Sequence, residues 1–345
     1  MSLRTKKTCR VLVVTGIYPT PEIPHLGTFV KAQVDSLIAA GLDVEVVHPH
    51  PGRRPLLRYI SAALQVFFKT LTGTFDIVHG HYGLWCLVAR LQWTTPVVAS
   101  FLGSDLLVDE KFATLFSKKD LLVTRISRWL CHHVNAVNVK SKEMKEAIAG
   151  INHVIVYPDG VDFSLFRPMP RAQARATLGW HPERNYILFG NDAQRPEKNF
   201  PLAQAAIERL HAKGITAELV VASGLAQNQV VFCINASNVV ILSSLYEGSP
   251  NIVKEAMACN VPVVATDVGD VAQIIGRTRG CVICSWDPDE VATALEEALH
   301  HTEPTTGRSD IAHLERSVIA QQIIVLYEQI VSSRRTARFH HLLGR

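Results

Sequence analysis

The residues most able to do chemistry lie in one short stretch, residues 245–266, which reads LYEGSPNIVKEAMACNVPVVAT. Glu247 precedes a predicted helix, and Glu255 lies inside that helix on the face that it shares with Asn251. The two carboxylates therefore flank the positive end of the helix instead of neutralising it. This arrangement suits a ligand that carries many hydroxyl groups.

The start of the same helix is the expected site for an anion. Ser249 is placed to cap the helix, and Pro250 suits its first position, where a missing N–H costs nothing. The backbone N–H groups of Gly248, Ser249 and Asn251 would then be free to bind a phosphate. The stretch as a whole therefore favours a polyhydroxylated ligand that also carries phosphate.

A second charged group, the loop RPEKN, follows a predicted strand at residues 186–189. Arg195 and Lys198 stand three residues apart in this loop, just before a predicted helix. One interpretation is a solvated basic loop. The other is that a guanidinium and an ammonium at the carboxyl end of a strand neutralise a diphosphate leaving group.

Alternating strands and helices are needed to bring these residues together. Strands predicted at residues 239–242 and 261–265 enclose the helix and make one βαβ unit. The chain opens in the same way, with a strand at 11–15, a helix at 29–40 and a strand at 44–48. We therefore predict a doubly wound α/β protein, and 345 residues allow two domains.

The first half of the chain offers its own candidates at the ends of strands. Gly27 opens the first helix and is either a turn glycine or a point where backbone approaches phosphate closely. His79 and His81 end a strand and share one of its faces. Because no third ligand follows at a readable spacing, we expect no metal site. Gly103 and Asp105 lie in the turn after the next apolar strand.

These motifs together resemble the retaining GT-B enzymes of glycosyltransferase family 4. The E-x7-E block from Glu247 to Glu255 carries most of the resemblance, with its following small-residue helix and PVVAT strand. The GSD turn at 103–105, the PDGVD linker at 158–162 and the RPEKN loop occur in the family's order. The resemblance implies a GT-B fold, in which two Rossmann-like doubly wound domains face a central cleft.

The family's organisation implies the extent of the two domains. We expect residues 1–165 to form the domain on the acceptor side and residues 166–329 to form the domain that binds the nucleotide sugar. Residues 330–345 are expected to return to the first domain.

The resemblance also implies a reaction, the transfer of a sugar from a nucleoside diphosphate sugar to an acceptor hydroxyl with retention at the anomeric carbon. Glu247 would engage hydroxyls of the donor sugar, and Glu255 the nucleotide ribose. Arg195 and Lys198, with the amides near Asn251, would stabilise charge on the diphosphate in place of a metal ion. No cofactor is expected, because the nucleotide sugar is a substrate.

In the first domain the resemblance assigns Gly27, His81, Gly103 and Asp105 to substrate binding. Leu102 stands where the family has a histidine, and a leucine cannot form that histidine's hydrogen bond. The contact is therefore lost or supplied by a neighbour such as His81. Two alternatives stay open: a GT-B sugar-nucleotide epimerase, and a relative that binds a nucleotide sugar without catalysis.

Composition limits the partners and the compartment. The chain has 48% apolar and 19% charged residues and a net charge of +4, which is typical of a globular protein. Seven scattered cysteines favour a reducing compartment, so we expect a cytoplasmic protein and interpret Cys281 and Cys284 as structural. No run approaches the roughly 18 apolar residues of a membrane span. We expect no nucleic-acid partner.

Two basic segments bear on the acceptor. Residues 51–70 include Arg54, Arg58 and Lys69 but no acid. This segment either lies on an anionic membrane or packs against the core with a solvated basic rim, and we prefer the second interpretation. Residues 333–345 are also basic and could touch a membrane or polyanion. These segments suggest a lipid-linked, glycan or anionic acceptor and peripheral contact with the inner face of a membrane.

Overall fold

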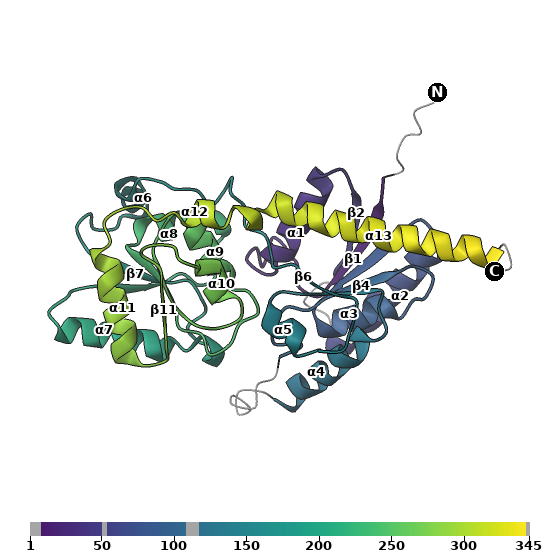
Figure 1. The fold of residues 1–345 in the computed structure, drawn as a ribbon, viewed down its shortest axis with the longest axis horizontal. Helices are drawn as coiled ribbons and strands as arrows, with labels where there is room; N and C mark the ends of the chain where they lie inside the picture. Colours follow the sequence, from purple (N-terminus) through teal and green to yellow (C-terminus); the bar gives the residue numbers. More distant parts are fainter. Residues whose placement is uncertain (1–7, 50–53, 108–116, 343–345) are drawn as a thin grey trace, which may run out of the picture. The chain divides into compact units, whose positions relative to one another are not determined.

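The computed structural model describes residues 8–49, 54–107 and 117–342 (Figure 1). The chain forms two compact units. One consists of Met1–Gly160 together with Ser317–Arg345, and the other of Val161–Arg316. Parts of the two basic segments, residues 51–53 and 343–345, lie outside the described residues.

The first unit contains a six-stranded parallel sheet in the order β2-β1-β3-β4-β5-β6. The inner strands are apolar because helices cover both faces of a doubly wound sheet, and Leu12, Val14 and Val78 are fully buried in its core. The strands are β1 (Arg10–Thr15), β2 (Asp43–Val47), β3 (Ile77–His81), β4 (Val97–Ser100), β5 (Ala136–Val139) and β6 (Val154–Val156).

The helices of this unit are α1 (Thr28–Ala39), α2 (Pro55–Leu71), α3 (Gly83–Arg90), α4 (Lys118–Cys131), α5 (Lys142–Glu146) and most of α13 (Arg316–Leu342). α13 joins this unit from Ser317 onward, earlier than the boundary at residue 330 that the sequence suggested. The reason is packing, because Tyr327 is fully buried and its hydroxyl meets the His79 ring.

The second unit contains a five-stranded parallel sheet in the order β11-β10-β9-β7-β8. Its strands are β7 (Tyr186–Phe189), β8 (Glu218–Val221), β9 (Val239–Leu242), β10 (Val263–Thr266) and β11 (Val282–Cys284). Its helices are α6 (Arg171–Leu178), α7 (Phe200–Ala212), α8 (Gln227–Ala236), α9 (Asn251–Ala258), α10 (Val271–Ile275), α11 (Pro288–His300) and α12 (Gly307–Asp310), with 3-10 turns at Pro196–Lys198 and Ala312–Leu314.

Each sheet has a point at which the chain reverses the direction in which it adds strands. From β1 the chain adds β2 on one side and β3 on the other, and from β7 it adds β8 on one side and β9 on the other. The loops that leave such neighbouring strands diverge, and ligands bind in the crevice between them. The fold therefore points to the loops after β1 and β3 in the first unit, and after β7 and β9 in the second.

Candidate functional site

The loops after β7 and β9 bring two of the predicted catalytic residues into contact. Lys198 Nζ lies 2.6 Å from Glu247 Oε1, and their side chains are only 11% and 12% exposed. The Ser244 hydroxyl donates to the same carboxylate oxygen at 2.8 Å. Lys198 and Glu247 therefore form a largely buried ion pair at the point where the topology of this sheet predicts a ligand.

Further hydrogen bonds fix the loop that carries Lys198. Ser243 Oγ lies 3.0 Å from the carbonyl oxygens of both Lys198 and Asn199. The Leu245 amide donates to the Glu197 carbonyl at 2.8 Å. Because both partners come from the loop after β9, the ammonium of Lys198 is held in register with Glu247.

Two glycines allow backbone to approach this site closely. A Cβ on Gly190, just after β7, would lie 2.3 Å from Ile252 Cγ1 in the first turn of α9. Gly269, with φ of +60°, packs against the loop before α9, and a Cβ there would lie 2.6 Å from the Gly248 carbonyl oxygen. The start of α9 is thus enclosed by backbone on two sides.

The start of α9 differs from the prediction by one residue. Pro250 is the N-cap, with extended backbone (φ −71°, ψ 118°), and the helix begins at Asn251. Ser249 is therefore not the cap. Its hydroxyl accepts a hydrogen bond of 3.0 Å from Lys254 Nζ, a side chain that is almost completely buried. The extended backbone at Pro250 places the start of the helix one residue later than predicted, so the predicted serine cap was wrong.

Glu255 lies one turn into α9, as predicted, and Asn251 begins the same face. Burial raises the pKa of the Glu255 carboxyl from 4.5 to about 7, and the neighbouring Lys254 ammonium only partly opposes that rise. A carboxyl kept close to neutrality by desolvation can donate or accept a hydrogen bond to a hydroxyl.

Arg195 does not share the arrangement of Lys198. Its guanidinium pairs with Glu197, and its side chain is 56% exposed. Of the two cations predicted for the diphosphate, the structure brings only Lys198 against Glu247. The sequence placed both in the same loop, where Arg195 is the N-cap of the 3-10 turn Pro196–Lys198 and Lys198 is its last residue.

The first unit presents Gly27 and the two histidines at its own crevice loops. Gly27 has φ of +70° at the start of α1, and a Cβ there would lie 2.5 Å from the Ile17 carbonyl oxygen. His79 is fully engaged, because Nδ1 lies 2.5 Å from Tyr327 Oη and Nε2 lies 2.7 Å from Ser100 Oγ. His79 is thus a structural link between β3, β4 and α13.

His81 behaves differently from His79. The two rings stack with centroids 4.3 Å apart, and His81 is 1% exposed. Its Nε2 is buried and has no hydrogen-bond partner among the described residues. Burial, together with the Lys140 ammonium, lowers the pKa of His81 to about 3, so the ring is neutral. A buried, neutral ring nitrogen without a partner is a group that a ligand hydroxyl could satisfy.

Asp105 was predicted to bind substrate, and the structure shows a structural role for its side chain. The side chain is fully buried, and its two oxygens accept from the amides of Leu102, Gly103 and Gly83 at 2.9 to 3.0 Å. Asp105 therefore holds the turn in place. Gly103 has φ of +139°, which explains the glycine at this position, and Leu102 is partly buried in the same turn.

Sequence reasoning missed two features of this crevice. Tyr82, directly after His81, has φ of +73°, a conformation that costs a non-glycine residue about 1–3 kcal/mol and that concentrates at functional sites. Lys140 follows β5, is 2% exposed and pairs with Asp159 of the PDGVD turn at 2.7 Å. A lysine at a strand's carboxyl end was a readable signal, whereas the strain at Tyr82 left none.

The described residues contain no group of three or more histidines, cysteines or acids placed to hold a metal ion. None of the helices in the described part of the chain is long and apolar enough to cross a membrane.

Comparison with known proteins identifies the family. Residues 6–165 match the model described as Glycosyltransferase Family 4, and residues 142–301 match Glycosyl transferases group 1. A putative teichuronic acid biosynthesis glycosyltransferase of Bacillus subtilis is 23% identical over 85% of this chain and 89% of its own length. A phosphatidyl-myo-inositol mannosyltransferase of Propionibacterium freudenreichii is 26% identical over 81% of this chain and 77% of its own.

Solved structures share the fold. Sucrose-phosphate synthase from Thermosynechococcus elongatus superposes with a TM-score of 0.74 at 18% identity, covering 95% of this chain and all of that one. Anabaena HepE in complex with UDP and glucose superposes with a TM-score of 0.67 at 16% identity, covering 93% of this chain and all of HepE. Both are glycosyltransferases with the GT-B fold, which confirms the predicted fold class. The chain belongs to the family 4, or group 1, glycosyltransferases.

Proposed function

We propose that this protein is a retaining glycosyltransferase that moves a sugar from a nucleoside diphosphate sugar to an acceptor hydroxyl. The observation that carries the proposal is the buried pair of Lys198 and Glu247 beside the start of α9. A cation and a carboxylate 2.6 Å apart suit a ligand that has a diphosphate next to a sugar with free hydroxyls.

In the proposed reaction the bond between the anomeric carbon and the diphosphate oxygen breaks, and its electron pair goes to the diphosphate. The acceptor oxygen forms the new bond on the same face of the sugar, and its proton passes to the departing diphosphate. Lys198 and the backbone N–H groups of Ser249 and Asn251 stabilise the growing negative charge. Glu247 holds sugar hydroxyls and Glu255 the ribose. We assign no protein nucleophile.

The names of relatives support a nucleotide-sugar donor and a hydroxyl acceptor. HepE was solved in complex with UDP-glucose, and relatives are named for D-inositol 3-phosphate and for phosphatidyl-myo-inositol. We therefore propose a lipid-linked or glycan acceptor. The cysteines among the described residues are all free, which supports work in a reducing compartment such as the cytoplasm.

The test begins with the donor. Thermal unfolding in the presence of UDP, GDP and ADP sugars should identify the sugar nucleotide that raises the midpoint of unfolding. That donor is then incubated alone and with candidate acceptors. Transfer only when the acceptor is present supports the proposal, conversion of the donor alone to another sugar nucleotide supports an epimerase, and tight binding without transfer or hydrolysis supports a non-catalytic role.

A further inference from the structure

α2 has three faces instead of the two that are usual for a surface helix. One face packs into the core of the first unit through Ala62 and Val66, which are 0% and 1% exposed. A second is polar. The third is apolar and open to solvent, which the preferred interpretation of a core-packing helix did not anticipate.

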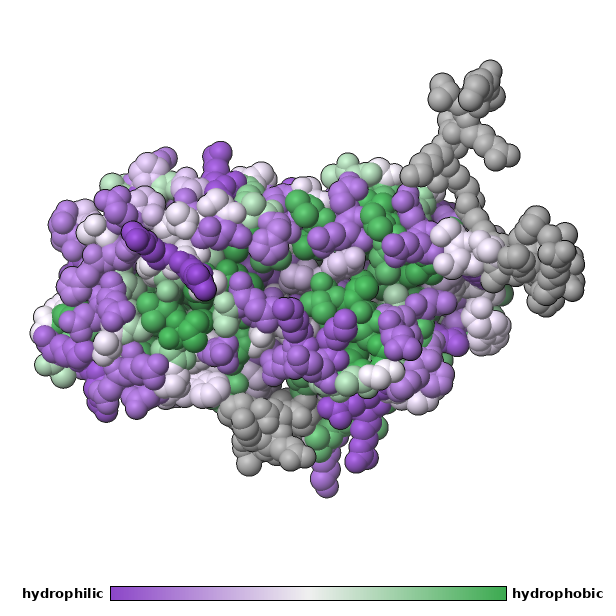
Figure 2. Space-filling model, viewed as in Figure 1, coloured by the Kyte–Doolittle hydropathy of each residue, from purple (hydrophilic) through white to green (hydrophobic). Residues whose placement is uncertain are grey.

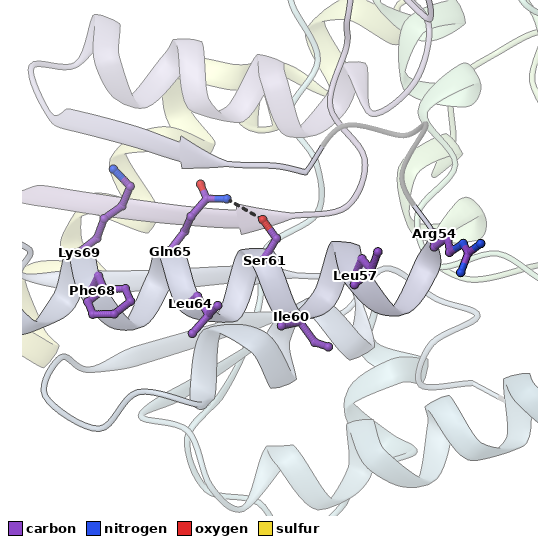
Figure 3. Close-up of a pocket in the computed structure, with 8 residues that line it drawn as sticks. All are labelled: Arg54, Leu57, Ile60, Ser61, Leu64, Gln65, Phe68 and Lys69. Carbon is purple, nitrogen blue, oxygen red and sulfur yellow. Dashed lines mark hydrogen bonds between the residues drawn. The ribbon is translucent and has the colours of Figure 1, made fainter.

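The open face is a continuous stripe. Leu57, Ile60, Leu64 and Phe68 recur at the spacing of one helix side, and they are 52%, 47%, 52% and 62% exposed. Figure 3 shows Ile60 and Leu64 on one side of α2 and Ser61, Gln65 and Lys69 on the other. An open hollow of about 720 Å³ runs along the helix, and residues of both the apolar and the polar side of α2 line it.

Exposed apolar residues also lie on α4 and directly after α3. α2 packs against α3, and α3 packs against α4, because the right-handed crossovers that follow β2, β3 and β4 place these helices on the same face of the sheet (Figure 1). Trp93, just after α3, is 74% exposed and lies edge to face with Phe67 of α2. On α4, Leu122 and Trp129 are 57% and 51% exposed.

Scattered apolar residues are normal on a protein surface, and Figure 2 shows several hydrophobic areas among hydrophilic ones on the face in view. The surface of α2 to α4 differs because cations accompany its apolar residues. These cations are Arg54, Lys118, Lys119, Arg125 and Arg128. Within α2 and α4 the one acid is Asp120, which caps its own helix. Nearby, Glu45 of β2 pairs with Lys69.

We propose that this surface, which we call the α2–α4 face, docks onto a lipid bilayer that contains anionic headgroups. Leucine and phenylalanine would enter the boundary between headgroups and acyl chains, tryptophan would lie at the level of the headgroups, and the cations would meet lipid phosphates. The composition of the face matches each of these layers.

The charges argue against a second copy of this chain as the occupant. A twofold dimer pairs a surface with itself, so the basic α2–α4 face would meet an equally basic one. Anionic lipid removes this repulsion, because the exposed cations on the face then meet opposite charges. The inference goes beyond sugar transfer and does not depend on it, since docking requires neither donor nor acceptor.

The test uses the full chain and vesicles of two compositions, phosphatidylcholine alone and an equimolar mixture of phosphatidylcholine and phosphatidylglycerol. Cosedimentation should show binding to the mixed vesicles that weakens with salt. The double variant Leu64→Gln/Phe68→Gln should lower the partition coefficient by about tenfold or more, because it removes two large apolar side chains from the buried layer. Arg125→Glu/Arg128→Glu should abolish the preference for anionic vesicles.

The matched control is Ile38→Gln on α1, an equally exposed apolar residue (49%) on the other side of the sheet. This variant should bind like the wild type, and all variants should keep the wild-type midpoint of thermal unfolding. Two results would overturn the proposal: wild-type protein that ignores anionic vesicles, or a Leu64→Gln/Phe68→Gln variant that still binds them fully. A wild-type dimer that this variant converts to a monomer would assign the face to a second copy instead.

Discussion

Replacing Lys198 by methionine tests the candidate site most directly. Methionine keeps an apolar stem of similar length, which matters because Lys198 is 8% exposed, and it removes only the charge. The change leaves Glu247 with the Ser244 hydroxyl as its remaining partner in this contact.

The structure sets the size of two separate effects. At the 2.6 Å separation of Lys198 and Glu247, the gross attraction is roughly 6 kcal/mol for an effective dielectric constant near 20. Desolvation offsets part of it, and Ser244 still donates to Glu247, so we expect a loss of about 3 kcal/mol in the free energy of unfolding. If Lys198 also stabilises the diphosphate, turnover at saturating donor should fall by about 100- to 1,000-fold.

Urea unfolding and a donor-saturated transfer assay measure these effects independently. Lys213→Met is the matched control, because Lys213 pairs with Glu296 at 2.9 Å but both side chains are well exposed, at 42% and 32%. That pair should contribute at most about 1 kcal/mol and nothing to turnover. Lys198→Met/Glu247→Gln should unfold less easily than Lys198→Met, since the double variant leaves no uncompensated charge.

Turnover of Lys198→Met within a few-fold of the wild type would refute the assignment of Lys198 to the diphosphate. Equal losses of stability in Lys198→Met and Lys213→Met would show that the buried pair contributes no more than a surface pair. A large loss of turnover with unchanged stability would keep the chemical role and refute the structural one.

Three further predictions concern both units. Because the pKa of Glu255 is raised from 4.5 to about 7, the folded state holds this proton more tightly than the unfolded state, so the free energy of unfolding should fall by about 3 kcal/mol as pH rises from 4.5 through 7. Glu255→Gln should remove that fall in urea unfolding curves at pH 5 and pH 8, and a fall that persists would contradict the assignment. His79→Ala should destabilise the protein by about 2 kcal/mol, because it removes the buried Tyr327 hydroxyl's contact with the ring and leaves Ser100 Oγ with Asn138 as its side-chain partner. His81→Ala should instead weaken donor or acceptor binding with little effect on stability; calorimetric titration and thermal unfolding separate the two. Gly190→Ala should lower both the midpoint of unfolding and the affinity for the donor. Adding Ile252→Val should restore part of both, since it removes Cδ1, one of the two Ile252 atoms nearest to the new Cβ. A double variant that recovers neither would show that the clash is not the cause.

The sequence predicted those parts of the site that depend on local order. The strand, loop, helix and strand around Glu247 follow from apolar runs and turn residues, and the loop with Lys198 follows from its place after β7. The register that brings Lys198 against Glu247 is a tertiary property, but parallel strands meet at one edge of a sheet, so their proximity was predictable.

Other features depend on contacts that no local pattern records. His79 meets Tyr327 across 248 positions of the chain, so the different roles of His79 and His81 were not visible in an H-x-H motif. Asp105 is a residue type that often binds substrates, but both of its carboxylate oxygens accept hydrogen bonds from backbone amides. Periodicity showed that α2 is amphipathic, yet a period alone does not tell which of two apolar faces enters the core.

The energetics of α9 connect the site to its function. The partly buried carboxyl of Glu255 costs stability at neutral pH, because desolvation raises its pKa and the nearby cation of Lys254 does not fully compensate. A neutral residue of similar size would remove this cost. Natural proteins keep residues that lower stability mainly where activity requires them. Gly190 and Gly269 also cost stability, because a glycine loses more conformational entropy on folding than other residues do. In return, they let the backbone approach the same helix start. These costs converge on the residues around Lys198 and Glu247, which is the pattern expected of a rigid binding site and not of a helix that serves only the core.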